Sequence, residues 1–398
     1  MAAKNRPEWR PLLGFIENDD ESEIRVEELS EFRASLNSLK AVGLILGVPG
    51  CESENCKEKV WLWCIRTLHV MLFLRWLVEL WNHAAEMSGS VLWNRAVLGM
   101  LHLNSVFNSY YFNTERHIEV IKKLVDDLSK IVRKYESSPR KSSLYRHVSI
   151  TVLGMFFAAF VVRLVETFYV PDFRSVAIGT QHILVGLLLY GSLYYSAIFM
   201  GVVFYQLNFI INHVTIQVKE KPMHAIKQHT MLGRFISDHV NKLFGIPILL
   251  MNVTIVFLTL DLLFTLNNQV SNEMWLSTYL HSVSGIIIMM AVIEMACRIS
   301  SSSETMPDLI YDQVVTRRIT SKTSIHACDL FLANFDTFSI RAWEDIRLDR
   351  KLILIFTGVI GFYAVVRAQR LANSVPLYML TNYDGEMSFV KDQNHHSF

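Results

Sequence analysis

The chain has 398 residues, of which 51% are hydrophobic and only 19% are charged, and its formal net charge is +1. Soluble domains usually carry about 25% charged residues, so this composition disfavours an ordinary soluble enzyme. The near-neutral charge gives no indication of a nucleic-acid partner. The apolar residues gather into runs of about 20, the length that a helix needs to cross the hydrocarbon core of a bilayer. We therefore expect an all-α, polytopic protein of the lipid membrane.

Seven hydrophobic segments follow one another along the chain. They predict transmembrane helices at Val60–Trp81, Leu92–Asn113, Ser149–Val170, Val176–Val203, Leu243–Leu266, Met274–Cys297 and Leu352–Ala368. A weaker stretch, Ile325–Ile340, is too short and too charged to span, and it predicts a helix outside the membrane. This layout divides the chain into an N-terminal segment (1–59), a seven-helix domain (60–370) and a C-terminal tail (371–398).

The segments between the spans differ sharply in lysine and arginine content. Those on one side of the membrane hold thirty such residues, and those on the other side hold two. Positively charged loops stay in the cytoplasm. The bias therefore predicts a plasma-membrane protein whose N-terminus is cytoplasmic and whose C-terminus is extracellular, the reverse of a G-protein-coupled receptor.

Apolar residues continue at helical spacing beyond two of the spans. After the second span they are Ile118, Ile121, Leu124, Val125, Leu128, Ile131 and Val132, and after the fourth they are Leu207, Ile210, Ile211, Val214 and Val218. A helix from Val176 to Val218 would be about 60 Å long, roughly twice the hydrocarbon thickness. We expect cytoplasmic helical extensions at about 114–148, 204–242 and 299–351. Their apolar stripes pack either within the subunit or against other subunits.

The end of the chain carries a motif. Leu348-Asp349-Arg350 leads into the last span, and Tyr363 and Gln369 follow inside it. With the predicted topology and the Leu36–Leu44 segment before the first span, this pattern resembles the insect gustatory and odorant receptor superfamily, and the gustatory receptors in particular. The chain departs from the family pattern at Phe362, where the family has Thr, and at Arg370, where it has Phe. Arg367 also interrupts the usual apolar run.

The resemblance implies a chemosensory receptor that acts as a ligand-gated, non-selective cation channel and opens on binding a small organic tastant. Four subunits, identical or mixed, would meet through their cytoplasmic helices, and one last helix from each would line the pore. The altered motif supports two alternatives. One is a non-conducting or transporter-like membrane protein of related fold, and the other is an odorant-type subunit that needs a co-receptor.

The last span has one stripe that could face a pore. At 3.6 residues per turn this stripe contains Ile355, Val359, Phe362, Val366 and Gln369. If Gln369 faces the pore, as the resemblance implies, a ring of Val366 could close it by dewetting. Tyr363 belongs to the family motif at this predicted gate, but its spacing turns it away from the stripe. Alternatively, Gln369 is an interfacial residue of an ordinary span.

Polar and aromatic residues gather in the outer halves of the third to sixth spans, where the resemblance places the ligand. The candidate ligand-binding residues are Arg163, Glu166, Tyr169, His182, Tyr190, Asp261, Trp275, Tyr279 and His281. Charges inside spans are costly and are functional candidates by default, and aromatic residues with a few polar groups suit a small organic or sugar-like ligand. Alternatively, Tyr169 and Trp275 lie near the membrane interface and belong to interfacial belts of aromatic residues. Arg163 and Glu166 would then form a structural pair. Tyr194 and Tyr195 are interpreted as packing residues.

Motifs of enzymes and of cofactor sites do not occur in the sequence. It has no glycine-rich phosphate loop, no metal-ligand spacing and no nucleophile elbow. We therefore expect neither an enzyme nor a bound cofactor. Glu294 and Arg298, one helical turn apart at the inner end of the sixth span, are expected to form a structural ion pair.

Overall fold

The computed structural model describes most of the hydrophobic part of the chain. The described ranges are 42–47, 56–83, 89–112, 117–124, 176–267, 275–316, 318–342 and 346–374, with isolated residues between them. The helices are α3 (Cys56–His83), α4 (Gly89–Tyr111), α7 (Val176–Gln217), α8 (Pro222–Phe235), the π-helix η2 (Ile236–Val240), α9 (Asn241–Asn267), α10 (Trp275–Val315), α11 (Lys322–Ala333) and α12 (Arg350–Ser374). A two-residue antiparallel ladder joins β1 (Arg341–Ala342) to β2 (Ile346–Arg347).

Six of the seven predicted spans coincide with helices, namely α3, α4, α7, α9, α10 and α12. The third, Ser149–Val170, lies outside the described residues apart from isolated positions. Within the described part of the chain, four stretches are long and apolar enough to cross a membrane: Cys56–His83, Ile183–Gln217, Pro222–Leu263 and Tyr279–Val315. The protein is therefore mainly helical and has the character of a multi-pass membrane protein.

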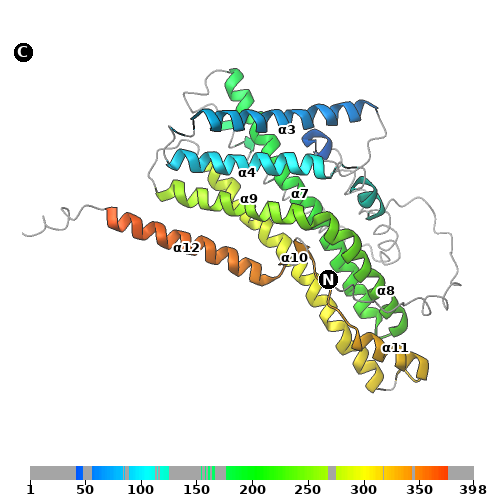
Figure 1. Ribbon diagram of the computed structural model, residues 1–398. Coiled ribbons are helices and arrows are strands. Elements are labelled where there is room, and N and C mark those ends of the chain that lie inside the picture. The colour runs from blue at the N-terminus through cyan, green and yellow to red at the C-terminus, as the bar shows by residue number, and fades with distance from the viewer. Residues whose placement is uncertain are drawn as a thin grey trace, which may run out of the picture.

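Two helices are much longer than a bilayer core. α7 has 42 residues and α10 has 41, so each is about 60 Å long at 1.5 Å per residue. Figure 1 shows them running side by side, with α8 and α11 beside their far ends. Because a membrane helix needs only about 20 residues, a large part of α7 and α10 must project beyond the bilayer.

The projecting part of α7 is covered within the subunit. The stripe predicted there, Leu207, Ile210, Ile211, Val214 and Val218, is almost completely buried. α8 and α10 pack against α7 and supply this cover. Of the two interpretations that the sequence allows for this stripe, the structure therefore supports packing inside the subunit. In the stripe after the second span, Ile121 and Leu124 are also buried, and the positions beyond Leu124 lie outside the described residues.

The predicted helix at Ile325–Ile340 is wrong in its second half, because α11 ends at Ala333. Asn334 ends it: its side-chain Nδ2 donates to the carbonyl of Leu330 at 2.8 Å and so satisfies one of the free helix-end carbonyls. The segment that follows is held to α9 by Asn241. The Asn241 Nδ2 donates to the carbonyl of Ser339 at 2.9 Å, and its Oδ1 accepts from the backbone N–H of Arg341 at 3.0 Å.

An aromatic triangle joins α7 and α9 to Phe112, the residue that directly follows α4. The ring centroids of Phe112, Phe199 and Phe244 lie 5.5 to 6.4 Å from one another, and all three side chains are buried. Nearer the start of α4, Trp93 stacks on Phe257 of α9 at 5.4 Å. These contacts fix α4 and α9 antiparallel and set their relative register.

The close packing of α3 against α4 depends on Gly99. A Cβ atom at this position would overlap the indole ring of Trp76, whose Nε1 donates to the carbonyl of Arg95 at 3.0 Å. We expect Gly99→Ala to lower the free energy of unfolding by about 1–3 kcal/mol, as other overpacked positions do. Gly201→Ala is the matched control, because no atom lies within 4 Å of the added Cβ there. Thermal unfolding in detergent checks this, and equal melting temperatures for the two variants would contradict it.

Candidate functional site

A stacked pair of aromatic rings joins α7 to α10 in the region predicted for ligand binding. The rings of Tyr190 and His281 are nearly parallel, with centroids 3.6 Å apart. The hydroxyl of Tyr194, one turn along α7, lies 3.0 Å from Nδ1 of the same histidine and donates to its backbone carbonyl at 3.4 Å. All three side chains are buried. Tyr194, interpreted from sequence as a packing residue, is thus a hydrogen-bonding partner of the predicted site.

Asp261 of α9 lies close to the level of this stack. The hydroxyl of Ser282 donates to the carbonyl of Leu258 at 3.0 Å, which brings α9 and α10 together one turn before Asp261. The aspartate is buried, and its Oδ1 has no hydrogen-bond partner within the described part of the chain. A buried carboxylate oxygen without a hydrogen bond is costly, so Asp261 remains a candidate for binding a polar group. Tyr279 lies near His281 and is 40% exposed.

The other predicted ligand residues have no described side chain. His182 lies in α7 and Trp275 is the first residue of α10, but the placement of their side chains is not described. Arg163, Glu166 and Tyr169 lie outside the described residues. The structure therefore brings together Tyr190 and His281, which came from separate spans in the sequence, and places Asp261 one turn along α9 from the Ser282–Leu258 contact.

The predicted pore stripe lies on the open face of α12. Phe362 is 73% exposed, Ile355, Val359 and Gln369 are also exposed, and Val366 is half-buried. Tyr363 lies about 100° around the helix from Phe362, and its ring stacks at 6.5 Å on Trp93 of α4. Figure 1 shows α12 extending beside α9 at the margin of the bundle. The stripe thus faces away from its own subunit, and Tyr363 anchors the helix to it.

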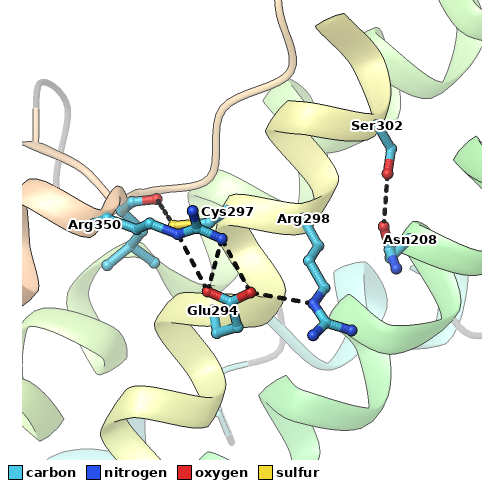
Figure 2. A network of polar contacts seen from close by, with 7 residues as sticks. Asn208, Glu294, Cys297, Arg298, Ser302 and Arg350 are labelled. Atoms are coloured by element: carbon cyan, nitrogen blue, oxygen red, sulfur yellow. Dashed lines mark hydrogen bonds and ion pairs between the residues drawn. The ribbon is translucent and has the colours of Figure 1, made fainter. Parts of the chain in front are cut away.

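The entry to α12 is fixed to α10 by a cluster of charges, which we call the α10–α12 joint. Figure 2 shows the carboxylate of Glu294 between two arginines. It accepts from Nη2 of Arg350 at 3.2 and 3.3 Å and from Nε of Arg298 at 3.3 Å. The Glu294–Arg298 pair was expected from its spacing, and this prediction is confirmed. Arg350 was missed as its partner, although it belongs to the Leu348-Asp349-Arg350 motif.

The rest of this motif caps α12. Oδ1 of Asp349 accepts from the backbone N–H groups of Lys351 at 3.0 Å and Leu352 at 3.3 Å, so Asp349 satisfies two free donors of the first turn. The thiol of Cys297 in α10 lies 3.8 Å from the carbonyl of Leu348. The motif therefore starts the helix at a defined place and ties that place to α10.

Comparisons with known proteins support this fold. The chain is similar to the insect olfactory receptor OR5 from Machilis hrabei, with a TM-score of 0.66 and 12% identity over 85% of this chain and 100% of that one. It is also similar to the same receptor in complex with eugenol, with a TM-score of 0.70 and 13% identity over 85% and 98% of the two chains. No family model and no curated protein sequence matches.

At this level of identity the likeness establishes the fold, which is that of the insect olfactory receptor OR5. This is the kind of fold that the resemblance seen in the sequence leads us to expect. Within the described residues, no group of His, Cys, Asp and Glu side chains could hold a metal ion. The candidate site is therefore the buried stack of Tyr190 and His281 with Tyr194 beside it, and the exposed stripe of α12 lies apart from it.

Proposed function

We propose that this chain is a subunit of a ligand-gated, cation-permeable channel of the insect chemoreceptor type, of the gustatory branch, and that a small organic molecule opens it. The observation that carries this proposal is the likeness of fold to an insect olfactory receptor over 85% of the chain. The Leu348-Asp349-Arg350 entry and the Tyr363 and Gln369 positions of α12 support the gustatory assignment. The lysine and arginine bias supports a plasma-membrane location with the N-terminus inside.

In this proposal, α10 connects the ligand to the pore. His281 lies near the start of α10 and Glu294 lies further along the same helix, about 20 Å away at 1.5 Å per residue. A ligand that binds between α7, α9 and α10 would displace α10, and the α10–α12 joint would pass the displacement to the entry of α12. The ligand opens the pore only if it binds the open arrangement more tightly than the closed one.

The proposed assembly is a tetramer, homomeric or heteromeric, in which α12 of each subunit lines a central pore. The exposed stripe of α12 supports this arrangement, because Phe362 and its neighbours along the stripe face away from their own subunit. The division into a cytoplasmic segment (1–59), a channel domain (60–370) and an extracellular tail (371–398) is part of the same proposal. If the purified chain is a monomer in a mild detergent, the proposed tetramer is contradicted.

Whole-cell recording from cells that express the chain alone tests the proposal. We expect a panel of sugars and bitter compounds to contain at least one that evokes a cation current. His281→Ala should weaken the response about tenfold or more, because it removes the stack on Tyr190 and the bond to Tyr194. Tyr311→Ala is the matched control, because Tyr311 is an exposed aromatic residue in the far half of the same helix. Equal sensitivity of the two variants would contradict the placement of the ligand.

Arg367 and Arg370 favour a second candidate function, a non-conducting or transporter-like relative or a subunit that needs a co-receptor. An arginine close to a pore repels cations, and both residues lie in the last turns of α12. Reconstitution of the purified chain into liposomes separates the candidates. A ligand that binds without opening a cation pathway would favour this second function.

A further inference from the structure

Three charged side chains meet near the end of α3 and the start of α4. The carboxylate of Glu79 accepts from Nε of Arg75, one turn earlier on α3, and from Nη1 of Arg95 on α4, each at 2.9 Å. Trp76 holds the two helices together at this level, because its Nε1 donates to the carbonyl of Arg95 at 3.0 Å. Two guanidinium groups thus share one carboxylate. We call these three side chains the Glu79 cluster, and their net charge is +1.

The Glu79 cluster lies at the level of one membrane surface. α3 is long and apolar enough to cross a membrane, and Lys57 and Lys59 lie in its first turn. The stretch of α3 from Lys59 to Glu79 is about 30 Å long, which is the thickness of the hydrocarbon core. If the lysines lie at one surface of the bilayer, Glu79 lies at the other and Arg75 lies one turn inside it. A long arginine side chain at this depth extends its charge towards the lipid headgroups.

Arg75 lies on an exposed, apolar face of α3. Met71 and Val78, one turn to either side of it, share this face and are exposed, as are Leu74 and Trp81. Figure 1 shows α3 and α12 at opposite margins of the bundle, with α4 and α9 between them. In the proposed tetramer α12 lines the central pore, so the exposed face of α3 points outward to the lipid.

We infer that the Glu79 cluster binds the phosphate group of a phospholipid whose acyl chains lie along the exposed face of α3. This inference goes beyond the proposed function. The net charge of the cluster complements the single negative charge of a phosphodiester. Each guanidinium has five N–H donors, and Arg75 and Arg95 each give one of them to Glu79. The donors that remain suit the paired hydrogen bonds by which arginine holds phosphate.

The phosphate needs no cavity to reach this cluster. The side chain of Arg75 is 60% exposed, and those of Glu79 and Arg95 are each 36% exposed. Ion pairs as open as these contribute little to stability, whereas a charge on a lipid-facing surface is costly. A phosphate at the headgroup level offsets this cost by pairing with the excess positive charge. Trp81, one turn beyond Val78, is 88% exposed and suits the same headgroup level.

Thermal unfolding of the purified full-length chain in a neutral detergent tests this inference. The probe is dioleoyl phosphatidylglycerol, and diolein is the control with the same acyl chains and no phosphate. We expect phosphatidylglycerol to raise the melting temperature by about 2–4 °C more than diolein does, as a ligand of the folded state does. Inorganic phosphate should leave it unchanged, because it lacks the acyl chains that pack on α3. Equal shifts from phosphatidylglycerol and diolein, or an equal shift from inorganic phosphate, would overturn the inference.

Two substitutions should change the phosphatidylglycerol shift in opposite directions. Arg75→Gln removes one guanidinium group and the excess charge, so it should abolish most of the shift. Glu79→Gln raises the net charge of the cluster to +2 and frees both guanidinium groups, so it should enlarge the shift. Each shift is measured from the lipid-free melting temperature of the same variant, so any loss of stability from the broken ion pair cancels.

Lys242→Gln is the matched control and should keep the wild-type shift. Lys242 also pairs with an acidic residue one turn earlier, Asp238, at 3.4 Å. If Arg75→Gln and Glu79→Gln both keep the wild-type shift, the Glu79 cluster is only a structural ion pair and the inference is overturned. Ligand-evoked currents without a phosphatidylglycerol shift would refute the phospholipid site and leave the proposed channel in place.

Discussion

Glu294→Arg is expected to reduce the ligand-evoked current about tenfold or more, within the range of ordinary coupling free energies. Arg350→Glu should have a similar effect, and the double variant should recover much of the current. In the wild-type chain, Glu294 accepts hydrogen bonds from Arg350 across 56 positions of sequence. Reversing either charge turns this attraction into repulsion at the entry to α12, and reversing both restores it.

This effect should not come from loss of folding. The side chains of Glu294 and Arg350 are 36% and 73% exposed, and pairs this exposed usually contribute less than about 1 kcal/mol to stability. Surface labelling should therefore find normal amounts of each variant at the membrane. The matched control is the exposed ion pair between Asp238 of η2 and Lys242 of α9, whose Oδ1 and Nζ atoms are 3.4 Å apart. Reversing both charges of this pair should leave the current unchanged. A full current from Glu294→Arg would remove the α10–α12 joint from the gating mechanism.

Local signals predicted the helices and the short-range contacts of this protein. Runs of apolar residues are a property of neighbouring positions, so α3, α4, α7, α9, α10 and α12 could be expected from the sequence. The Glu294–Arg298 pair follows from helical spacing in the same way. The Asn241 bonds and the Arg350 partner could not be predicted, because they depend on how the segment before α12 docks on α9 and α10.

The candidate ligand site was predicted only in part, for a physical reason. Tyr190, His281 and Asp261 were selected because aromatic and charged groups within spans are conspicuous. Tyr194 was missed, because its hydrogen bonds to His281 depend on how α7 packs against α10 and not on a pattern of neighbouring residues.

Val366→Asn is expected to produce a current without ligand. In the proposed tetramer, a ring of Val366 closes the pore because water leaves a narrow apolar constriction, and an amide at this position keeps the constriction hydrated. The exposed stripe of α12 supports this orientation, since Phe362 faces outward one turn before Val366 while Tyr363 packs on Trp93. We expect the resting conductance to rise about tenfold or more, the change that a shift of 1.4 kcal/mol in the gating equilibrium produces.

Ala364→Asn is the control for this prediction, because residue 364 lies two positions from Val366 and about 200° around the helix. The same amide on that face should leave the resting current unchanged. Gln369→Ala should change ion selectivity and leave the pore closed at rest, since Gln369 lies on the exposed stripe but is polar already. The measurement is whole-cell current at several voltages before any ligand is added. Equal leaks from Val366→Asn and Ala364→Asn would show that the predicted stripe is not the pore-lining face of α12, and a closed Val366→Asn channel would place the gate elsewhere.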